Sequence, residues 1–175
     1  AFDAGGGINA SEVMRIDGSG KVLIGTTTEG HENADNLTLE DSAAAGITLR
    51  SASNNSGGVF FSDGTSGAAE YAGILQYDHA SNYMRVYTDG SERMRITSSG
   101  QLLIGTTSTS GVSASSDDIV IGSIGDSTYR GITFATTSEA AIRWADAGDN
   151  AMGRIEYSNS NDKMTLHTSN AERIR

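Results

Sequence analysis

The sequence predicts an all-β fold made of repeated small antiparallel β modules that are joined by β-hairpin stalk motifs. Three observations support this prediction: a long motif recurs at a fixed spacing, apolar residues alternate with polar ones in short runs, and glycine, asparagine or aspartate residues separate the runs. Alternation with a period of two suits a pleated strand that has one buried face. Frequent turn residues between such strands are typical of all-β chains.

The recurring motif, which we call the stalk motif, reads SEVMRIDGSGKVLIGTT at residues 11–27 and SERMRITSSGQLLIGTT at residues 91–107. A third copy begins at residues 171–175. The glutamates at the second position of the copies lie 80 residues apart, at Glu12, Glu92 and Glu172. A fixed period of this length is typical of an array of repeats. We therefore expect the chain to be part of a longer repetitive protein.

The repeat divides the chain into three predicted parts. Residues 1–30 contain the first stalk motif with a partial unit before it. Residues 31–110 form a repeat unit with a β module and the second stalk motif. Residues 111–175 form a second β module that is truncated at the third stalk motif. Loops of varying length between fixed strands explain why the spacing drifts above 80 within the modules and then returns to it.

The apolar runs place the strands of the two modules. In the first module we expect strands near Leu37–Leu39, Ile47–Leu49, Val59–Phe61, Tyr71–Tyr77 and Tyr83–Thr88. The corresponding strands of the second module are expected near Ile119–Ile121, Ile132–Phe134, Ile142–Trp144, Arg154–Tyr157 and Lys163–Thr168. Turn residues separate most of these runs.

Each stalk motif is predicted to be a tight hairpin whose returning strand is apolar on both faces. Such a strand must be covered on both sides, and copies of the same chain would provide the cover. The glycine after the apolar run would allow a close backbone approach. The residues that we assign to assembly are Met14, Ile16, Val22, Leu23, Ile24, Gly25, Met94, Ile96, Leu102, Leu103, Ile104 and Gly105.

Charged residues in the stalk motifs have two interpretations. Glu12 with Arg15, and Glu92 with Arg95, would form cross-strand or inter-chain ion pairs that set the strand register. The simpler interpretation, which we favour, is a solvated strand face.

Composition limits the function classes. Hydrophobic residues make up 37% of the chain and aromatic residues 6%, so we expect stability to come from association or from stacking of repeats. The net charge of −10 repels phosphate backbones, which makes nucleic acid an unfavourable partner. The chain contains no cysteine, and therefore no disulfide or thiolate chemistry. Without a long apolar run, no membrane insertion is expected.

Candidate chemistry is sparse, and we assign no catalytic, cofactor-binding or metal-binding residue. The histidines His31, His79 and His167 occupy non-equivalent repeat positions, which disfavours a repeat-built metal site. Acidic residues adjoin glycine, serine or asparagine, where turns favour them. Tyr77 and Tyr157 are equivalent in the repeat, and this equivalence favours packing over sugar binding.

The stalk motif resembles the "ERMRIDSSGNVGIGTT" repeat of bacteriophage tail fibres and tailspike-like virion proteins. The resemblance is strong at residues 11–27 and 91–107 and at the start of the third copy, and weaker over residues 46–88 and 131–168. It implies an intertwined homotrimeric, β-rich fibre on a virion, which contacts other virion or tail proteins. The motif departs from the family where KVLI and QLLI replace NVGI, and the chain contains no proline.

We therefore expect a non-enzymatic shaft segment of a phage tail fibre, which extends and presents host-recognition elements with at most weak adhesion to host-surface glycans. One alternative is an extracellular adhesive filament of a bacterial cell surface. A further alternative is a tailspike-type polysaccharide depolymerase that uses paired carboxylates. A monomeric β-solenoid is the main structural rival, because stacked repeats would also cover two-sided apolar strands.

Overall fold

A computed structural model describes residues 2–3, 12–115, 117–125, 127, 130–145, 147–148, 152–169 and 171–174. Ser11 and Arg175, the outermost residues of the first and third stalk motifs, lie outside this set. The chain divides into two compact units, Ala1–Ser91 and Glu92–Arg175. Within the described residues both units consist of strands and loops, with one short 3-10 helix in the first. None of these residues forms a helix that is long and apolar enough to cross a membrane.

The first unit begins with a small mixed sheet. Its strands are β1 (Phe2–Asp3), β2 (Glu12–Ile16), β3 (Val22–Ile24) and β4 (Leu37–Leu39). β2 and β3 form the predicted hairpin, whereas β3 and β4 pair in parallel across a long loop. The parallel pair was not part of the antiparallel prediction.

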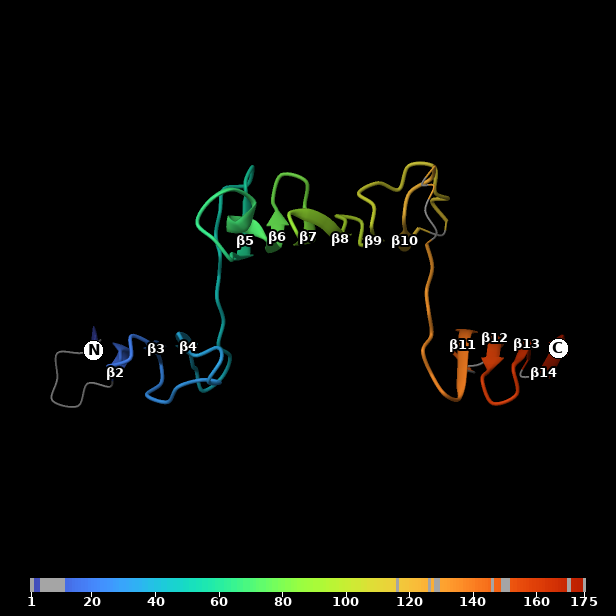
Figure 1. Ribbon diagram of the computed structural model, residues 1–175, viewed down its shortest axis with the longest axis horizontal. Helices are drawn as coiled ribbons and strands as arrows, with labels where there is room; N and C mark the ends of the chain where they lie inside the picture. Colours follow the sequence, from blue (N-terminus) through green and yellow to red (C-terminus); the bar gives the residue numbers. More distant parts are fainter. Residues whose placement is uncertain are drawn as a thin grey trace. The chain divides into compact units, whose positions relative to one another are not determined.

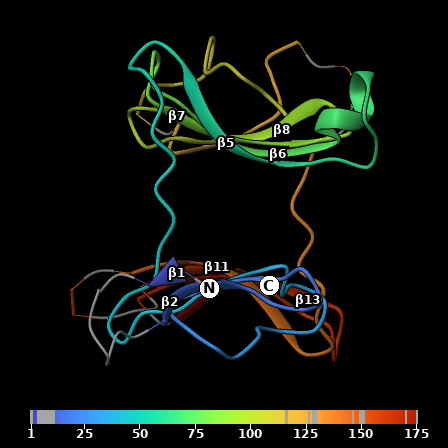
Figure 2. The same ribbon diagram turned by 90° about the vertical axis from the view of Figure 1, so that its left-hand side faces the viewer.

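A meander follows this sheet in the first unit. Its strands are β5 (Ser56–Phe61), β6 (Gly73–Asp78) and β7 (Tyr83–Thr88), and both neighbouring pairs are antiparallel. The 3-10 helix η1 (Gly67–Tyr71) connects β5 to β6 (Figure 2). Tyr71, which the sequence placed at the start of a strand, is therefore the last residue of this helix.

The second unit repeats the stalk strands β2 to β4 and the meander strands β5 to β7 in the same order. Its stalk strands are β8 (Ser91–Ile96), β9 (Leu102–Ile104) and β10 (Ile119–Ile121), with β9 and β10 again parallel. The meander consists of β11 (Glu139–Trp144), β12 (Gly153–Ser158) and β13 (Lys163–Thr168), and it continues into β14 (Ala171–Ile174). In Figure 1 these four strands lie side by side in chain order.

Turn dihedral angles repeat together with the strands. Asn82 and Asp162 have φ of 53° and 50° in the β6–β7 and β12–β13 turns, and Asp89 and Ser169 have φ of 52° and 49° after the meanders. Asparagine and aspartate tolerate this left-handed region better than other non-glycine residues. The two units therefore share backbone geometry as well as strand order.

Two predicted strands are wrong. Residues 47–49 and 132–134 are not assigned to a strand, although their apolar residues alternate as predicted. The alternation identifies residues that suit a pleated strand, but a strand also needs a partner ladder, and β5 and β11 pair with β6 and β12 instead. The side chains of Ile47, Leu49, Ile132 and Phe134 are exposed.

The hydrophobic core is very small. Among the described residues only Leu23, Leu103 and Val120 are buried hydrophobic side chains, and all three lie in the stalk sheets. Small sheets normally bury one face against a second layer of structure. Here most large apolar side chains of the sheets remain partly exposed in the single chain.

Candidate assembly surface

The stalk hairpins close through side-chain hydrogen bonds that add to the backbone hydrogen bonds of each turn. In the first hairpin the Asp17 carboxylate accepts hydrogen bonds from the amides of Ser19 and Lys21, at 2.8 and 2.9 Å. The bond from Lys21 is the main cause that lowers the pKa of Asp17. In the second hairpin the Thr97 hydroxyl accepts from the Gln101 amide at 3.1 Å. A carboxylate and a hydroxyl thus perform the same local task.

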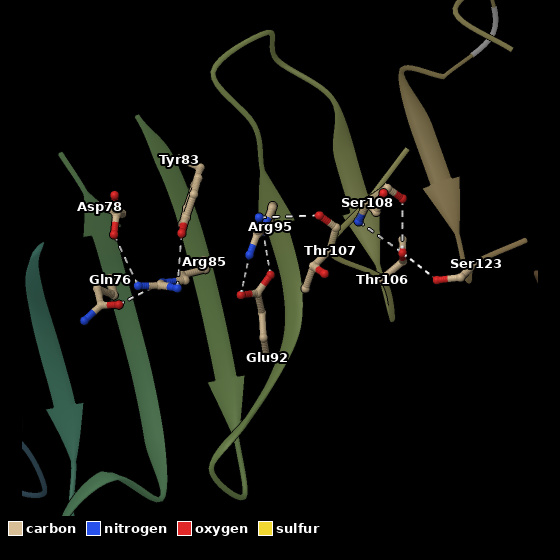
Figure 3. Close-up of polar contacts among 10 residues, drawn as sticks. All are labelled: Gln76, Asp78, Tyr83, Arg85, Glu92, Arg95, Thr106, Thr107, Ser108 and Ser123. Carbon is tan, nitrogen blue, oxygen red and sulfur yellow. Dashed lines mark hydrogen bonds and ion pairs between the residues drawn. The ribbon is translucent and has the colours of Figure 1, made fainter. Parts of the chain in front are cut away.

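The first strand of each of the first two stalk motifs, β2 and β8, carries an ion pair between residues three positions apart. Arg15 donates two hydrogen bonds to the Glu12 carboxylate, and Arg95 donates to Glu92 at 2.6 and 2.8 Å (Figure 3). The bonds from Arg15 lower the pKa of Glu12. Both pairs lie within one strand of one chain.

A register shift accompanies this strand in the first and third stalk motifs. It occurs where β1 pairs with β2 and where β13 pairs with β14. An extra residue in a ladder changes which side chains share a face. This explains how residues three positions apart, which would point to opposite faces of a regular strand, come together as Glu12 and Arg15 do.

One face of each stalk sheet is covered by its own chain. Arg15 pairs across the ladder with Leu23, and Arg95 with Leu103, so these side chains share a face. Leu23 and Leu103 are each only 1% exposed. We call this surface the covered stalk face. The burial of these leucines requires no second chain.

Charged and polar contacts border the covered stalk face. In the first unit the Lys21 ammonium donates to Asp35 at 2.6 Å and to Glu29 at 2.7 Å, and these bonds raise the pKa of Lys21, with Asp35 the main cause. In the second unit Gln101 donates to Asp117 at the corresponding place. The loop after β9 is closed by Thr106, whose hydroxyl lies 2.7 Å from that of Ser123 (Figure 3).

The opposite face of each stalk sheet is apolar throughout, and we call it the apolar stalk face. The ladder registers place on it Met14, Ile16, Val22, Ile24, Leu37 and Leu39 in the first unit, and Met94, Ile96, Leu102, Ile104, Ile119 and Ile121 in the second. Ile16 is 59% exposed and Ile119 is 62% exposed. Two side chains of this face in the first unit and three in the second are exposed, and the others are half-buried. An apolar face that the chain leaves partly uncovered is typical of an interaction surface.

The glycine that follows each apolar strand has a left-handed backbone. Gly25 and Gly105 have φ of 76° and 67°. A Cβ atom on Gly25 would overlap the backbone oxygen of Glu40, a residue whose amide donates a hydrogen bond to the Ile24 carbonyl oxygen. A Cβ atom on Gly105 would instead lie 3.3 Å from the Arg130 guanidinium. Close backbone approach, as predicted for both positions, therefore occurs at Gly25, and within the chain itself.

Ten of the twelve residues assigned to assembly from the sequence are the apolar stalk-face residues Met14, Ile16, Val22, Ile24, Met94, Ile96, Leu102 and Ile104, and the glycines Gly25 and Gly105. The other two, Leu23 and Leu103, lie on the covered face. Sequence reasoning missed the contribution of β4 and β10 to the apolar face. The alternation of Leu37, Thr38 and Leu39 was the available signal, since it places both leucines on one face.

The histidines make local contacts. The His79 ring meets the edge of Tyr77 with centroids 4.9 Å apart, the His167 ring lies 2.9 Å from the Thr165 hydroxyl, and His31 accepts from the Asn33 amide. In the part of the chain that the structure describes, no three His, Asp or Glu side chains form a group that could hold a metal ion.

Comparison of the sequence with models of known protein families and with curated proteins found no match.

Proposed function

We propose that this chain is a shaft segment of a homotrimeric phage tail fibre, in which the apolar stalk faces of three chains pack together. The observation that carries the proposal is the apolar stalk face, which recurs in both units with six apolar side chains and remains open in the single chain. The resemblance of the stalk motif to tail-fibre repeats supplies the chain number and the virion context.

The energetics support assembly through repeated faces. Covering a half-exposed aliphatic side chain contributes about 1 kcal/mol, and the more exposed members of each apolar stalk face, such as Ile16, Leu37 and Ile119, each offer a contribution of this size. Association costs about 4–15 kcal/mol because each chain loses translational and rotational freedom, and this cost arises once for the whole chain. Each further repeat adds burial without adding that cost. A longer shaft is therefore more stable, as a structure that must transmit force requires.

The function that follows is mechanical: the segment extends the fibre and presents recognition elements that lie elsewhere in the whole protein. In this role it contacts other copies of itself and other virion or tail proteins. Weak adhesion to host-surface glycans would use aromatic side chains near the surface. The Arg85 guanidinium lies 5.0 and 5.4 Å from the ring centroids of Tyr83 and Tyr87, within the range of a cation–π contact with each ring.

The solution mass tests the proposal. We expect static light scattering to give three times the chain mass of 18.2 kDa at every concentration above the dissociation range. A mass of one chain at all accessible concentrations, together with a cooperative thermal transition, would contradict the trimer and favour the monomeric solenoid.

A further inference from the structure

The meanders of the two units have the same kind of side chains on one face and different side chains on the other. On one face the ladder registers align Val59, Phe61, Leu75, Tyr77, Met84 and Val86 with Ile142, Trp144, Ile155, Tyr157, Met164 and Leu166. We call this surface the apolar meander face. All twelve side chains are apolar or aromatic. When both copies of a repeat in one chain have the same apolar surface, that surface has the same packing requirement in each copy.

The opposite face, which we call the polar meander face, differs between the units. In the first unit Arg85 donates to Gln76 at 2.8 Å and to Asp78 at 3.4 Å (Figure 3). In the second unit the positions of Gln76 and Arg85 hold Glu156 and Thr165, and Glu156 pairs with Arg154 at 2.9 Å. The main charges of each network have an oppositely charged partner within the chain, although in the second unit the Nε atom of Arg154 and the Nδ1 atom of His167 are buried without a hydrogen bond.

The edge strand of the meander gives the sharpest contrast. Val59 and Phe60 are neighbours on β5, point to opposite faces and are similarly exposed, at 49% and 53%. In the second unit the corresponding positions hold Ile142 and Arg143. The chain therefore tolerates a charge at the Phe60 position in one of its own copies, whereas the Val59 position is aliphatic in both.

A groove runs along the apolar meander face. Leu49, in the segment that the sequence predicted as a strand, lies beside Gly57 and lines this groove of about 330 Å³ together with Ile47, Val59 and Leu75. The second unit has an equivalent groove of about 180 Å³ that is lined by Phe134, Ile142 and Ile155. Both grooves thus use an extended segment that has no ladder partner.

We propose that the apolar meander face and its groove are a contact between copies of this chain, and that the polar meander face stays outside the assembly. The inference rests on the proposed self-assembly and extends it from the stalk sheets to the modules between them. A partner must present an apolar surface that matches the groove of each unit. A second copy of this chain presents such surfaces, because each of its units carries an apolar meander face.

The charge of the chain also favours a second copy as the partner of the apolar meander face. Copies with a net charge of −10 repel one another, so a contact that is free of charged side chains is the more favourable place for them to associate. None of the twelve side chains of the apolar meander face is charged. Phe61 and Trp144 are the large aromatic residues that such contacts use as anchors, and both are more than half exposed in the single chain.

Matched arginine substitutions test this contact. The Val59→Arg/Ile142→Arg variant places arginine on the apolar meander face of both units. The Phe60→Arg variant, together with the natural Arg143, places it on the polar face of both. We expect the first variant to dissociate at a protein concentration at least about 100-fold higher than the unsubstituted chain, because a buried unpaired charge costs several kcal/mol. Phe60→Arg should stay within about twofold. Analytical ultracentrifugation measures both.

The results separate this inference from the proposed function. If the unsubstituted chain never assembles, the proposed function fails and this contact with it. If it assembles but the double variant dissociates like the unsubstituted chain, or Phe60→Arg weakens assembly equally, only the inference is overturned.

A second measurement applies if the double variant does not fold. The chain has no cysteine, so Val59→Cys and Phe60→Cys each provide a single reporter. In the assembled state we expect maleimide to label the cysteine at position 59 at least about tenfold more slowly than after dissociation by dilution, as burial of a thiol requires. The rate at position 60 should change less than about twofold. Equal protection of both positions, or of neither, would contradict the inference.

Discussion

The two stalk sheets share strand order, register and an apolar face, but they stabilise their edges differently. The first sheet uses charges: Asp17 closes its hairpin, and Lys21 joins Asp35 and Glu29. The second replaces Asp17 and Lys21 by neutral groups, with Thr97 in the hairpin and Gln101 bonded to the Asp117 carboxylate. The comparison shows that the repeat requires hydrogen bonds at these edges but not a particular charge.

The covered stalk faces also differ in polarity, and again the first sheet is the more polar of the two. Leu23 lies beside Thr38 in the first sheet, whereas its counterpart Leu103 lies beside the buried Val120. The second sheet therefore buries one more aliphatic side chain. We infer that the first sheet depends more on ionised groups and the second more on apolar burial, and three predictions test this contrast.

The largest effect is expected at the buried leucines. Leu23→Ala and Leu103→Ala should each lower the free energy of unfolding by about 3 kcal/mol, because the buried side chain leaves a cavity. Chemical denaturation of each variant measures the loss. Ile16→Ala is the control, and in the dissociated chain it should cost much less because Ile16 is exposed. Equal losses in all three variants would show that the covered face is not the core.

Glycine substitutions should separate the two sheets. Gly25→Ala should destabilise by about 3 kcal/mol, since its Cβ would overlap the Glu40 backbone in addition to the strain of a positive φ. Gly105→Ala should cost only about 1 kcal/mol, because the neighbouring Arg130 side chain can move. Thermal denaturation of the two variants compares them. A larger loss for Gly105→Ala would contradict this account.

The smallest effect is a difference in acid sensitivity. The lowered pKa of Asp17 means that its contribution is present above about pH 4 and is lost as the pH falls through the lower folded-state value. Asp17→Thr should therefore reduce the loss of thermal stability between pH 7 and pH 2.5. The reciprocal Thr97→Asp should increase it. Melting curves of the two variants at both pH values provide the test, and changes of the same sign would refute it.

Much of this fold could be predicted from the sequence. The stalk hairpins, the meander strands and the turn at Ser98–Gly100 follow from alternation and from residues that tolerate turn geometry. Local patterns determine these features, because each strand pairs with one that is near in the chain. The repeat itself indicated that both units would have the same elements.

Features that depend on a partner could not be predicted in this way. Ile47–Leu49 has a strand pattern, but a pattern does not show whether a ladder is available to it. The Glu12–Arg15 pair needs a register shift that no residue type specifies. The two faces of β3 looked alike, because Val22, Leu23 and Ile24 are all aliphatic. Only the pairing partners Arg15 and Thr38 reveal which face the chain covers itself.

The order of strand pairing has an evolutionary consequence. Within each unit every strand pairs with one adjacent to it in the sequence, whether the ladder is parallel or antiparallel. Gene duplication or unequal recombination that inserts one whole period therefore preserves every ladder, whereas an insertion within a strand would divide one. Selection for a longer or shorter protein can act in steps of one repeat, and related lineages should differ in length by multiples of about 80 residues.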